Sequence, residues 1–198
     1  SEYLAGFDNG ASGDITIEQL LTHNSGLPLS IITSTNQYDS LIELANETDK
    51  IGPQFEPGSK FWYSDAGTEV LGAIIEMKTG TPLDVFVSNE ILEPLRMNNS
   101  FYYTPGSQND SRRGDINPLY VGGIGEWIKI WEPEEPLYPF AFGSQSIYST
   151  PLDYAHFLAM LMDNGTYMGR QVISKDAVNR ILTPVSKLSS LGSDMPDP

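Results

Sequence analysis

The stretch KFWYSDAGTEVLGAIIEMKTG, residues 60–80, contains the clearest helix signal of the chain. Its apolar residues repeat with the spacing of one helical face, and Gly80 stands where a left-handed residue would end the helix. Ser64 or Asp65 can cap the first turn, because a side-chain oxygen there accepts a hydrogen bond from an unpaired backbone amide. Tyr63 lies directly before this cap. These three polar residues are therefore either a simple helix start or part of a catalytic site.

Other helices are expected on both sides of this stretch, because the same kinds of signal recur. Thr16 with Gln19, and Thr150 with Asp153, have the three-residue spacing of a capping box. The expected helices are one directly after Thr16, 36–48, 82–92, one that begins at Pro151, and 174–183 after Ser174. The helix after Pro151 is expected to bury Tyr154, Phe157, Leu158, Leu161 and Met162.

Residues 98–146 have no helical period and are rich in Gly, Pro, Asn and aromatic residues. They predict a long irregular loop with one or two short strands. A connection of this length within a compact domain indicates a functional loop, or one that packs against another part of the protein. The chain is accordingly interpreted as one unit with four regions. These are helices and the Tyr63 loop in 1–97, the irregular region 98–146, a helical pair in 147–184, and a disordered or truncated tail in 185–198.

Composition restricts the partners that the chain can have. Its 26 acidic and 11 basic residues give a formal net charge of −15, which repels phosphate backbones and anionic lipid surfaces. No apolar run approaches the roughly 20 residues that a membrane span needs. The absence of cysteine excludes disulfides and thiolate metal sites. We therefore expect neither nucleic acid nor membrane as a partner.

A serine–histidine–aspartate triad would have to use His23 or His156, the only histidines of the chain. His156 lies within the helix predicted after Pro151, at the edge of its apolar face. His23 ends the first helix, where a histidine can bond the last carbonyls and favour the negative helix end. Both patterns favour structural roles. The motifs G-x-S-x-G, H-E-x-x-H and the P-loop are absent from the sequence.

Three stretches carry a family resemblance, and they occur in the order ITIEQLLTHNSGLP, FEPGSKFWYSDAGTEVLGAIIEMKTGTPLDVFVSNEILEPLRMNNSFY and FGSQSIYSTPLDYAHFLAMLMDNG. Together they resemble the serine β-lactamase-like family, which includes class C β-lactamases, penicillin-binding DD-peptidases and esterases. The resemblance implies that Tyr63 is the proton-relay tyrosine of a Y-x-N motif. It implies that Asp65 replaces the asparagine of that motif, which contacts substrate. A second alignment takes Ser64 and Asp65 as the start of an S-D-N motif, but Ala66 then replaces the asparagine.

The same resemblance implies acyl transfer through a serine ester, with no metal and no cofactor. The substrate would be a small ester, a peptide ending in a D-amino acid, or a β-lactam, and the location periplasmic or secreted. The parent fold is α+β with an antiparallel sheet. This chain would be its predominantly α-helical subdomain, with long irregular loops and little strand.

The family also needs a nucleophile motif, S-x-x-K, and a K-T-G or H-x-G strand. No lysine of this chain has a serine three residues before it, so S-x-x-K is absent. Lys78-Thr79-Gly80 matches K-T-G, but it stands at a helix end, where lysine followed by glycine is ordinary helix termination.

We therefore expect a middle segment of a serine hydrolase that is inactive on its own; the alternative is a non-catalytic binding or scaffolding module. The segment is also expected to expose apolar surface through which it could self-associate. The candidates for that surface are Trp127, Trp131, Tyr138, Phe140 and Phe142.

Overall fold

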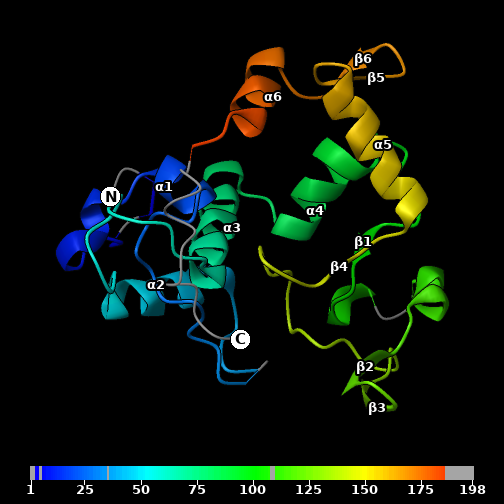
Figure 1. Ribbon diagram of the computed structural model, residues 1–198, viewed down its shortest axis with the longest axis horizontal. Coiled ribbons are helices and arrows are strands. Elements are labelled where there is room, and N and C mark those ends of the chain that lie inside the picture. Colours follow the sequence, from blue (N-terminus) through cyan, green and yellow to red (C-terminus); the bar gives the residue numbers. More distant parts are fainter. Residues whose placement is uncertain (1–2, 5, 35, 108–109, 186–198) are drawn as a thin grey trace.

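The computed structural model describes residues 3–4, 6–34, 36–107 and 110–185, and it is mostly helical, with 41 % helix and 11 % strand (Figure 1). The helices are α1 Ile17–Leu21, α2 Leu41–Ile51, α3 Asp65–Thr79, α4 Leu83–Val87, α5 Pro151–Met162 and α6 Lys175–Leu182. A π-helical turn, Ser88–Leu92, extends α4, and 3₁₀ turns occupy Gly10–Asp14, Pro105–Ser107 and Ser111–Asp115. Most of the tail expected at 185–198 lies outside the described residues.

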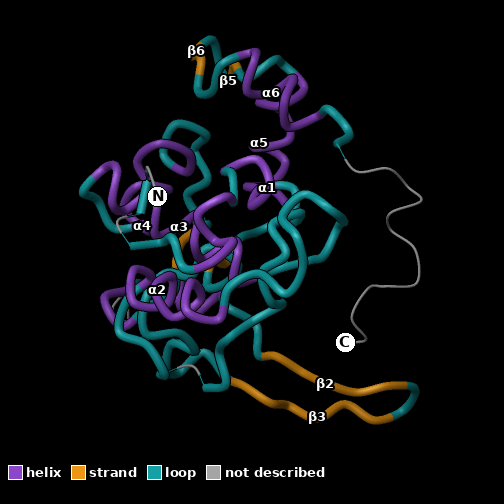
Figure 2. The backbone as a smooth tube through the Cα atoms, turned by 90° about the vertical axis from the view of Figure 1, so that its left-hand side faces the viewer, coloured by secondary structure: helices purple, strands orange, loops and turns teal. Residues whose placement is uncertain are grey.

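The strands form three antiparallel pairs. These pairs are β1 Phe101–Tyr102 with β4 Ile147–Tyr148, β2 Leu119–Gly123 with β3 Glu126–Trp131, and β5 Thr166–Tyr167 with β6 Arg170–Gln171. Residues 98–146 thus hold more strand than the sequence suggested, because β2 and β3 make a complete hairpin. Figure 2 shows this hairpin projecting from the body of the molecule.

Helix α3 begins and ends as its sequence predicts. The Ser64 hydroxyl accepts the Gly67 amide hydrogen at 2.8 Å, and Gly80 ends the helix in the left-handed conformation, with φ 66°. Gly72 lets α2 pack closely, since a Cβ there would lie 2.9 Å from the Leu41 side chain. Val70 and Ala73 of α3 are buried in the same cluster as Leu41. This helix is therefore the centre of the first hydrophobic core.

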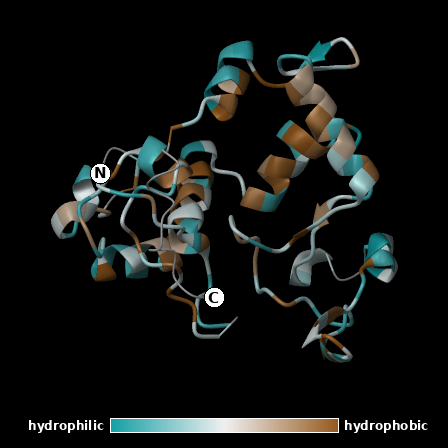
Figure 3. Ribbon diagram, in the orientation of Figure 1, coloured by the Kyte–Doolittle hydropathy of each residue, from teal (hydrophilic) through white to brown (hydrophobic). Residues whose placement is uncertain are grey.

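A second core lies between the end of the α4 segment and α5. It contains Leu92, Leu95, Met97 and Met160. Hydrophobic residues are concentrated on α3, α4 and α5 (Figure 3). His156 contributes to this region structurally: its Nδ1 lies 2.9 Å from the Leu95 carbonyl oxygen, and its ring stacks on Tyr167.

Two helices differ from the expectation. Helix α2 starts at Leu41 rather than near residue 36, because the Ser40 hydroxyl accepts the Glu43 amide hydrogen at 3.1 Å and the Glu43 carboxylate accepts the Asp39 amide hydrogen at 2.8 Å. The buried face predicted for α5 is only partly right: Phe157 and Leu161 pack against the second core, but the other three residues do not. Its buried residues are Asp153 and Met160, whereas the expected core residues Tyr154, Leu158 and Met162 are exposed by 53 %, 44 % and 87 %.

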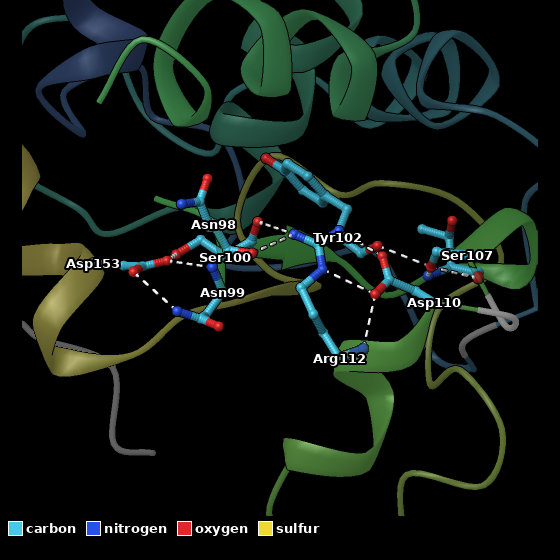
Figure 4. Close-up of polar contacts among 9 residues, drawn as sticks. Asn98, Asn99, Ser100, Tyr102, Ser107, Asp110, Arg112 and Asp153 are labelled. Atoms are coloured by element: carbon cyan, nitrogen blue, oxygen red, sulfur yellow. Dashed lines mark hydrogen bonds and ion pairs between the residues drawn. The ribbon is translucent and has the colours of Figure 1, made fainter. Parts of the chain in front are cut away.

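The reason lies in a polar cluster that turns α5 inward at Asp153 (Figure 4). The Asp153 carboxylate accepts hydrogen bonds from the Asn99 amide at 2.7 Å and from the Ser100 hydroxyl at 2.8 Å. Beside it, Arg112 makes a two-pronged contact with Asp110 and donates to the Ser100 carbonyl at 3.0 Å. Each nitrogen of the guanidinium is bonded within the protein, so this cluster holds the fold together.

The loop region that contains the β2–β3 hairpin is held together where it leaves and re-enters the fold. The buried Tyr103 donates its hydroxyl hydrogen to the Pro133 carbonyl at 3.1 Å, and Trp131 stacks on Tyr148 with ring centroids 5.9 Å apart. Of the aromatic residues expected on an exposed apolar surface, Trp127 is 68 % exposed in the hairpin, but Phe142 is only 1 % exposed and belongs to the first core. No helix of the described residues is both long and apolar enough to cross a membrane.

Candidate active site

The residues before α3 are held by the turn that follows α1. Trp62 donates its amide hydrogen to the His23 carbonyl at 2.7 Å, and Asp65 donates to the Leu29 carbonyl at 2.8 Å. The turn itself needs Gly26, which has φ 78° and leaves no room for a Cβ, since that atom would lie 2.4 Å from the Phe55 carbonyl oxygen. Backbone hydrogen bonds to residues far away in the sequence therefore fix where the segment from Trp62 to Asp65 lies.

Tyr63 is 41 % exposed and rests against the imidazole of His23, with ring centroids 4.5 Å apart. The Ser64 amide donates to His23 Nδ1 at 3.2 Å, so the ring makes this contact instead of the expected one with the carbonyls at the end of α1. Burial lowers the pKa of His23, although the Asp65 carboxylate opposes this effect. A neutral imidazole thus supports the phenol ring from one side.

The hydroxyl of Tyr63 is kept protonated. Burial raises the pKa of Tyr63, and the nearby Asp65 carboxylate raises it further. A phenol can act as a base near neutral pH only when nearby cations stabilise its phenolate. The described residues alone leave Tyr63 an unreactive phenol.

Ser64 and Asp65 differ in how free their side chains are. The Ser64 hydroxyl is buried and engaged twice, since it donates to the Pro28 carbonyl at 2.7 Å and caps α3 through Gly67. Asp65 is the first residue of α3 and is half-buried. The structure therefore brings the carboxylate, and not the serine hydroxyl, to the phenol of Tyr63.

Glu69 is a residue of this region that the sequence did not single out. It lies one turn after Asp65 and its side chain is fully buried. Its carboxylate accepts hydrogen bonds from the Gly143 amide at 2.7 Å, the Ser144 amide at 3.1 Å and the Ser144 hydroxyl at 2.5 Å. Burial raises the pKa of Glu69, and these hydrogen bonds oppose the rise. The available signal was an acidic residue among the apolar positions of a helix.

Segment 138–146 therefore lies against the first turns of α3. Gly143 is so close that a Cβ there would come within 2.5 Å of the Thr68 carbonyl oxygen. Tyr138 donates its hydroxyl hydrogen to Gln145 Oε1. Burial raises the pKa of Tyr138, and the charge of Asp65 adds to this rise. The Asp65 carboxylate is thus within electrostatic range of both Tyr63 and Tyr138.

Other parts of the molecule offer less for chemistry than this region. A hollow of about 780 Å³ lies between α1 and α6, lined by His23, Phe61 and mainly apolar side chains. The described residues contain no group of three or more His, Cys, Asp or Glu side chains that could hold a metal ion. The N-terminus of α3, with Tyr63, Asp65 and segment 138–146, is the best candidate for chemistry.

The chain is similar in sequence and in fold to known proteins. The Beta-lactamase family profile matches residues 1–187. Lovastatin esterase from Penicillium rubens is 30 % identical over 169 residues, which are 79 % of this chain and 42 % of that protein. N-acetylmuramyl-L-alanine amidase from Bacillus subtilis strain 168 is 36 % identical over 118 residues, 52 % of this chain and 26 % of that protein.

The crystal structure of FmtA from Staphylococcus aureus has the same fold over 92 % of this chain and 47 % of that chain, with a TM-score of 0.73 and 21 % identity. The chain spans less than half the length of each of these relatives. The family match covers almost the whole sequence, and it includes the helix start that carries Tyr63. The chain therefore belongs to the β-lactamase family, as its sequence motifs indicated.

Proposed function

We propose that this chain is the helical part of a serine hydrolase that works by acyl transfer, with Tyr63 as its proton relay. The observation that carries the proposal is the placement of Tyr63 at the start of α3, with its ring on His23 and with the charge of Asp65 close enough to act on it. The family acts on esters, amides of D-amino acids or β-lactams. We expect the substrate to be a small molecule of one of these classes.

In this proposal the nucleophilic serine and its lysine come from outside the 198 residues, together with the antiparallel sheet that completes an α+β fold. The exposed apolar side chains around the hollow between α1 and α6 support this view. Leu21, Ile181 and Val185 are exposed by 63 %, 59 % and 54 %. Such a surface is typical of one that another part of the protein covers.

The steps then follow from ordinary acyl-transfer chemistry. The serine oxygen attacks the carbonyl carbon of the substrate while its proton passes to the Tyr63 phenolate. That proton is then given to the leaving group, and an acyl ester remains on the serine. Water attacks this ester and loses a proton to the same phenolate; the acid is released as that proton passes to the serine oxygen, which restores the serine hydroxyl and the phenolate. The lysine and other cations of the completed site would have to lower the pKa of Tyr63 against the effects of burial and Asp65.

Asp65 favours uncharged or cationic substrates in this proposal. An asparagine at its position could both donate and accept a hydrogen bond, whereas a carboxylate only accepts. Its negative charge also repels substrates that carry a carboxylate, as β-lactams and peptide stems do. A substrate carbonyl oxygen that the asparagine would have paired is left without a donor beside Asp65, and such an unpaired group costs about 1–3 kcal/mol. We therefore expect the protein to prefer short esters, or substrates with a free amine, over β-lactams.

The test uses the full-length protein that contains this chain. We expect it to hydrolyse a p-nitrophenyl ester with a higher kcat/KM than nitrocefin, and Asp65→Asn to shift this ratio toward nitrocefin. Tyr63→Phe should lower kcat for both substrates, whereas Tyr120→Phe, a change at an exposed tyrosine of the hairpin, should not. An unchanged kcat in Tyr63→Phe would remove the relay role. A full-length protein that turns over neither substrate would favour a non-catalytic binding module.

The hairpin supports a separate proposal, that the chain can self-associate. Both of its strands are almost entirely exposed, and neither outer edge is paired among the described residues. Its exposed apolar residues are Leu119, Tyr120, Val121, Ile124, Trp127, Ile128 and Ile130. Unpaired strand edges with apolar side chains are templates for further pairing.

A further inference from the structure

Gln145 occupies a fixed place next to the candidate site. Its neighbour Ser144 is bonded twice to Glu69. Its other neighbour, Ser146, is buried in a left-handed conformation with φ 71°, and the Ser146 carbonyl accepts the Tyr103 amide hydrogen at 3.0 Å. The Ser146 hydroxyl also accepts the Phe142 amide hydrogen at 2.9 Å. The backbone of Gln145 is therefore held on both sides, and only its half-exposed side chain is free to adjust.

Tyr138 orients that side chain. Its hydroxyl donates to Gln145 Oε1, so the carbonyl end of the amide is occupied. Burial and the charge of Asp65 raise the pKa of Tyr138, which keeps the phenol protonated and able to donate. The other end of the amide carries two N–H donors. Among the described residues, no hydrogen-bond acceptor is found for Gln145 Nε2.

The orientation of the Gln145 amide matters because Asp65 has no hydrogen-bond donor. The Asp65 carboxylate can only accept hydrogen bonds, yet a substrate with a second carbonyl in its acyl group needs a donor at this place. The segment that carries Gln145 is bonded to α3 through Glu69, one turn from Asp65. Tyr138, which holds the Gln145 amide, is itself within electrostatic range of Asp65. An unused donor thus lies in the same region of the molecule as the carboxylate.

We infer that Gln145 determines specificity by donating a hydrogen bond from Nε2 to a carbonyl oxygen in the acyl part of the substrate. The preferred substrates are then uncharged N-acylamino esters, in which an amide carbonyl lies two atoms from the carbon that is attacked. The inference rests on the proposed hydrolase function. Gln145 would supply the hydrogen-bond donor that Asp65 lacks, so the substrate carbonyl would no longer be unpaired. The charge of Asp65 would still repel anionic substrates.

The experiment compares two esters on the full-length protein, the p-nitrophenyl esters of N-acetylglycine and of pentanoic acid. Both acyl chains have the same length, and only the first has a second carbonyl. Gln145→Glu keeps the shape of the side chain but removes its donors, and Gln145→Leu removes all its polar atoms. We expect each variant to lower kcat/KM for the N-acetylglycine ester about tenfold relative to the pentanoate ester, as loss of one hydrogen bond requires.

Two further variants make the result specific. Tyr138→Phe removes the group that orients the amide, and we expect a smaller change of the same ratio. Gln54→Glu, at an exposed glutamine in the loop before α3, should leave the ratio unchanged. The rate with the pentanoate ester reports whether each variant is folded.

An unchanged ratio in both Gln145 variants, with the pentanoate ester still hydrolysed, would overturn the role of Gln145 and leave the hydrolase proposal standing. An equal loss of both rates in Gln145→Leu and Gln145→Glu would show a structural residue and also overturn the inference. A wild-type protein that hydrolyses neither ester and forms no acyl-enzyme would overturn the proposed function itself.

Discussion

Replacement of the buried Glu69 by alanine should loosen segment 138–146 from α3. The change removes the acceptor of the Gly143 and Ser144 amides and of the Ser144 hydroxyl. Each amide left without a partner costs about 1–3 kcal/mol, and both residues are half-buried, so values near the lower limit apply. With the packing lost around the shortened side chain, we expect Glu69→Ala to lower the free energy of unfolding by about 3 kcal/mol.

The measurement is urea unfolding of the full-length protein, in which a lower midpoint at unchanged slope reports lost stability. The matched control is Glu90→Ala, which truncates an exposed glutamate and should change stability by at most about 0.5 kcal/mol. A difference between the two variants of less than about 1 kcal/mol would contradict the idea that Glu69 anchors the segment.

The remaining predictions concern pH, chemistry and association. Because the pKa of Glu69 is raised in the folded state, its contribution to stability is complete below its unfolded pKa and is lost as pH rises through the folded pKa. Glu69→Gln should remove this pH dependence of the free energy of unfolding, measured by unfolding curves at a series of pH values. Identical pH profiles of the variant and the wild type would refute the prediction. The 198-residue chain alone should form no covalent acyl-enzyme with a fluorescent penicillin, and mass spectrometry that located an adduct on any of its serines would show otherwise. Sedimentation should detect association of this chain that Trp127→Lys weakens; a strictly monomeric chain would contradict the role of the hairpin.

Local chemistry allowed much of the helical structure to be predicted. Thr16, Ser64 and Thr150 cap helices as their spacing indicated, because a cap depends only on residues three positions away. The start of α2 was wrong because Tyr38 fits the apolar spacing, while the reciprocal bonds of Ser40 and Glu43 end the helix later in the chain. Helical periodicity alone could not decide between the two.

The candidate site was predictable only in part. The motif located Tyr63 and Asp65, since both lie at one helix start. The bond between Glu69 and Gly143 joins residues 74 positions apart, and no local pattern reports such a contact. The buried face of α5 was predicted only in part for the same reason, because Asp153 turns inward to bond residues 53 and 54 positions before it.

The loop region that contains the hairpin is held together at its base, so its length can change without altering the geometry of the site. Tyr103 is tied both to Pro133 and to Ser146, so the chain leaves and re-enters the fold through neighbouring points. Residues between these points can be lengthened, shortened or exchanged without displacing the strands β1 and β4 that border them. The tip at Ile124 is therefore the natural place to insert a fluorescent label or a foreign peptide into this protein while its helix-bound residues keep their places.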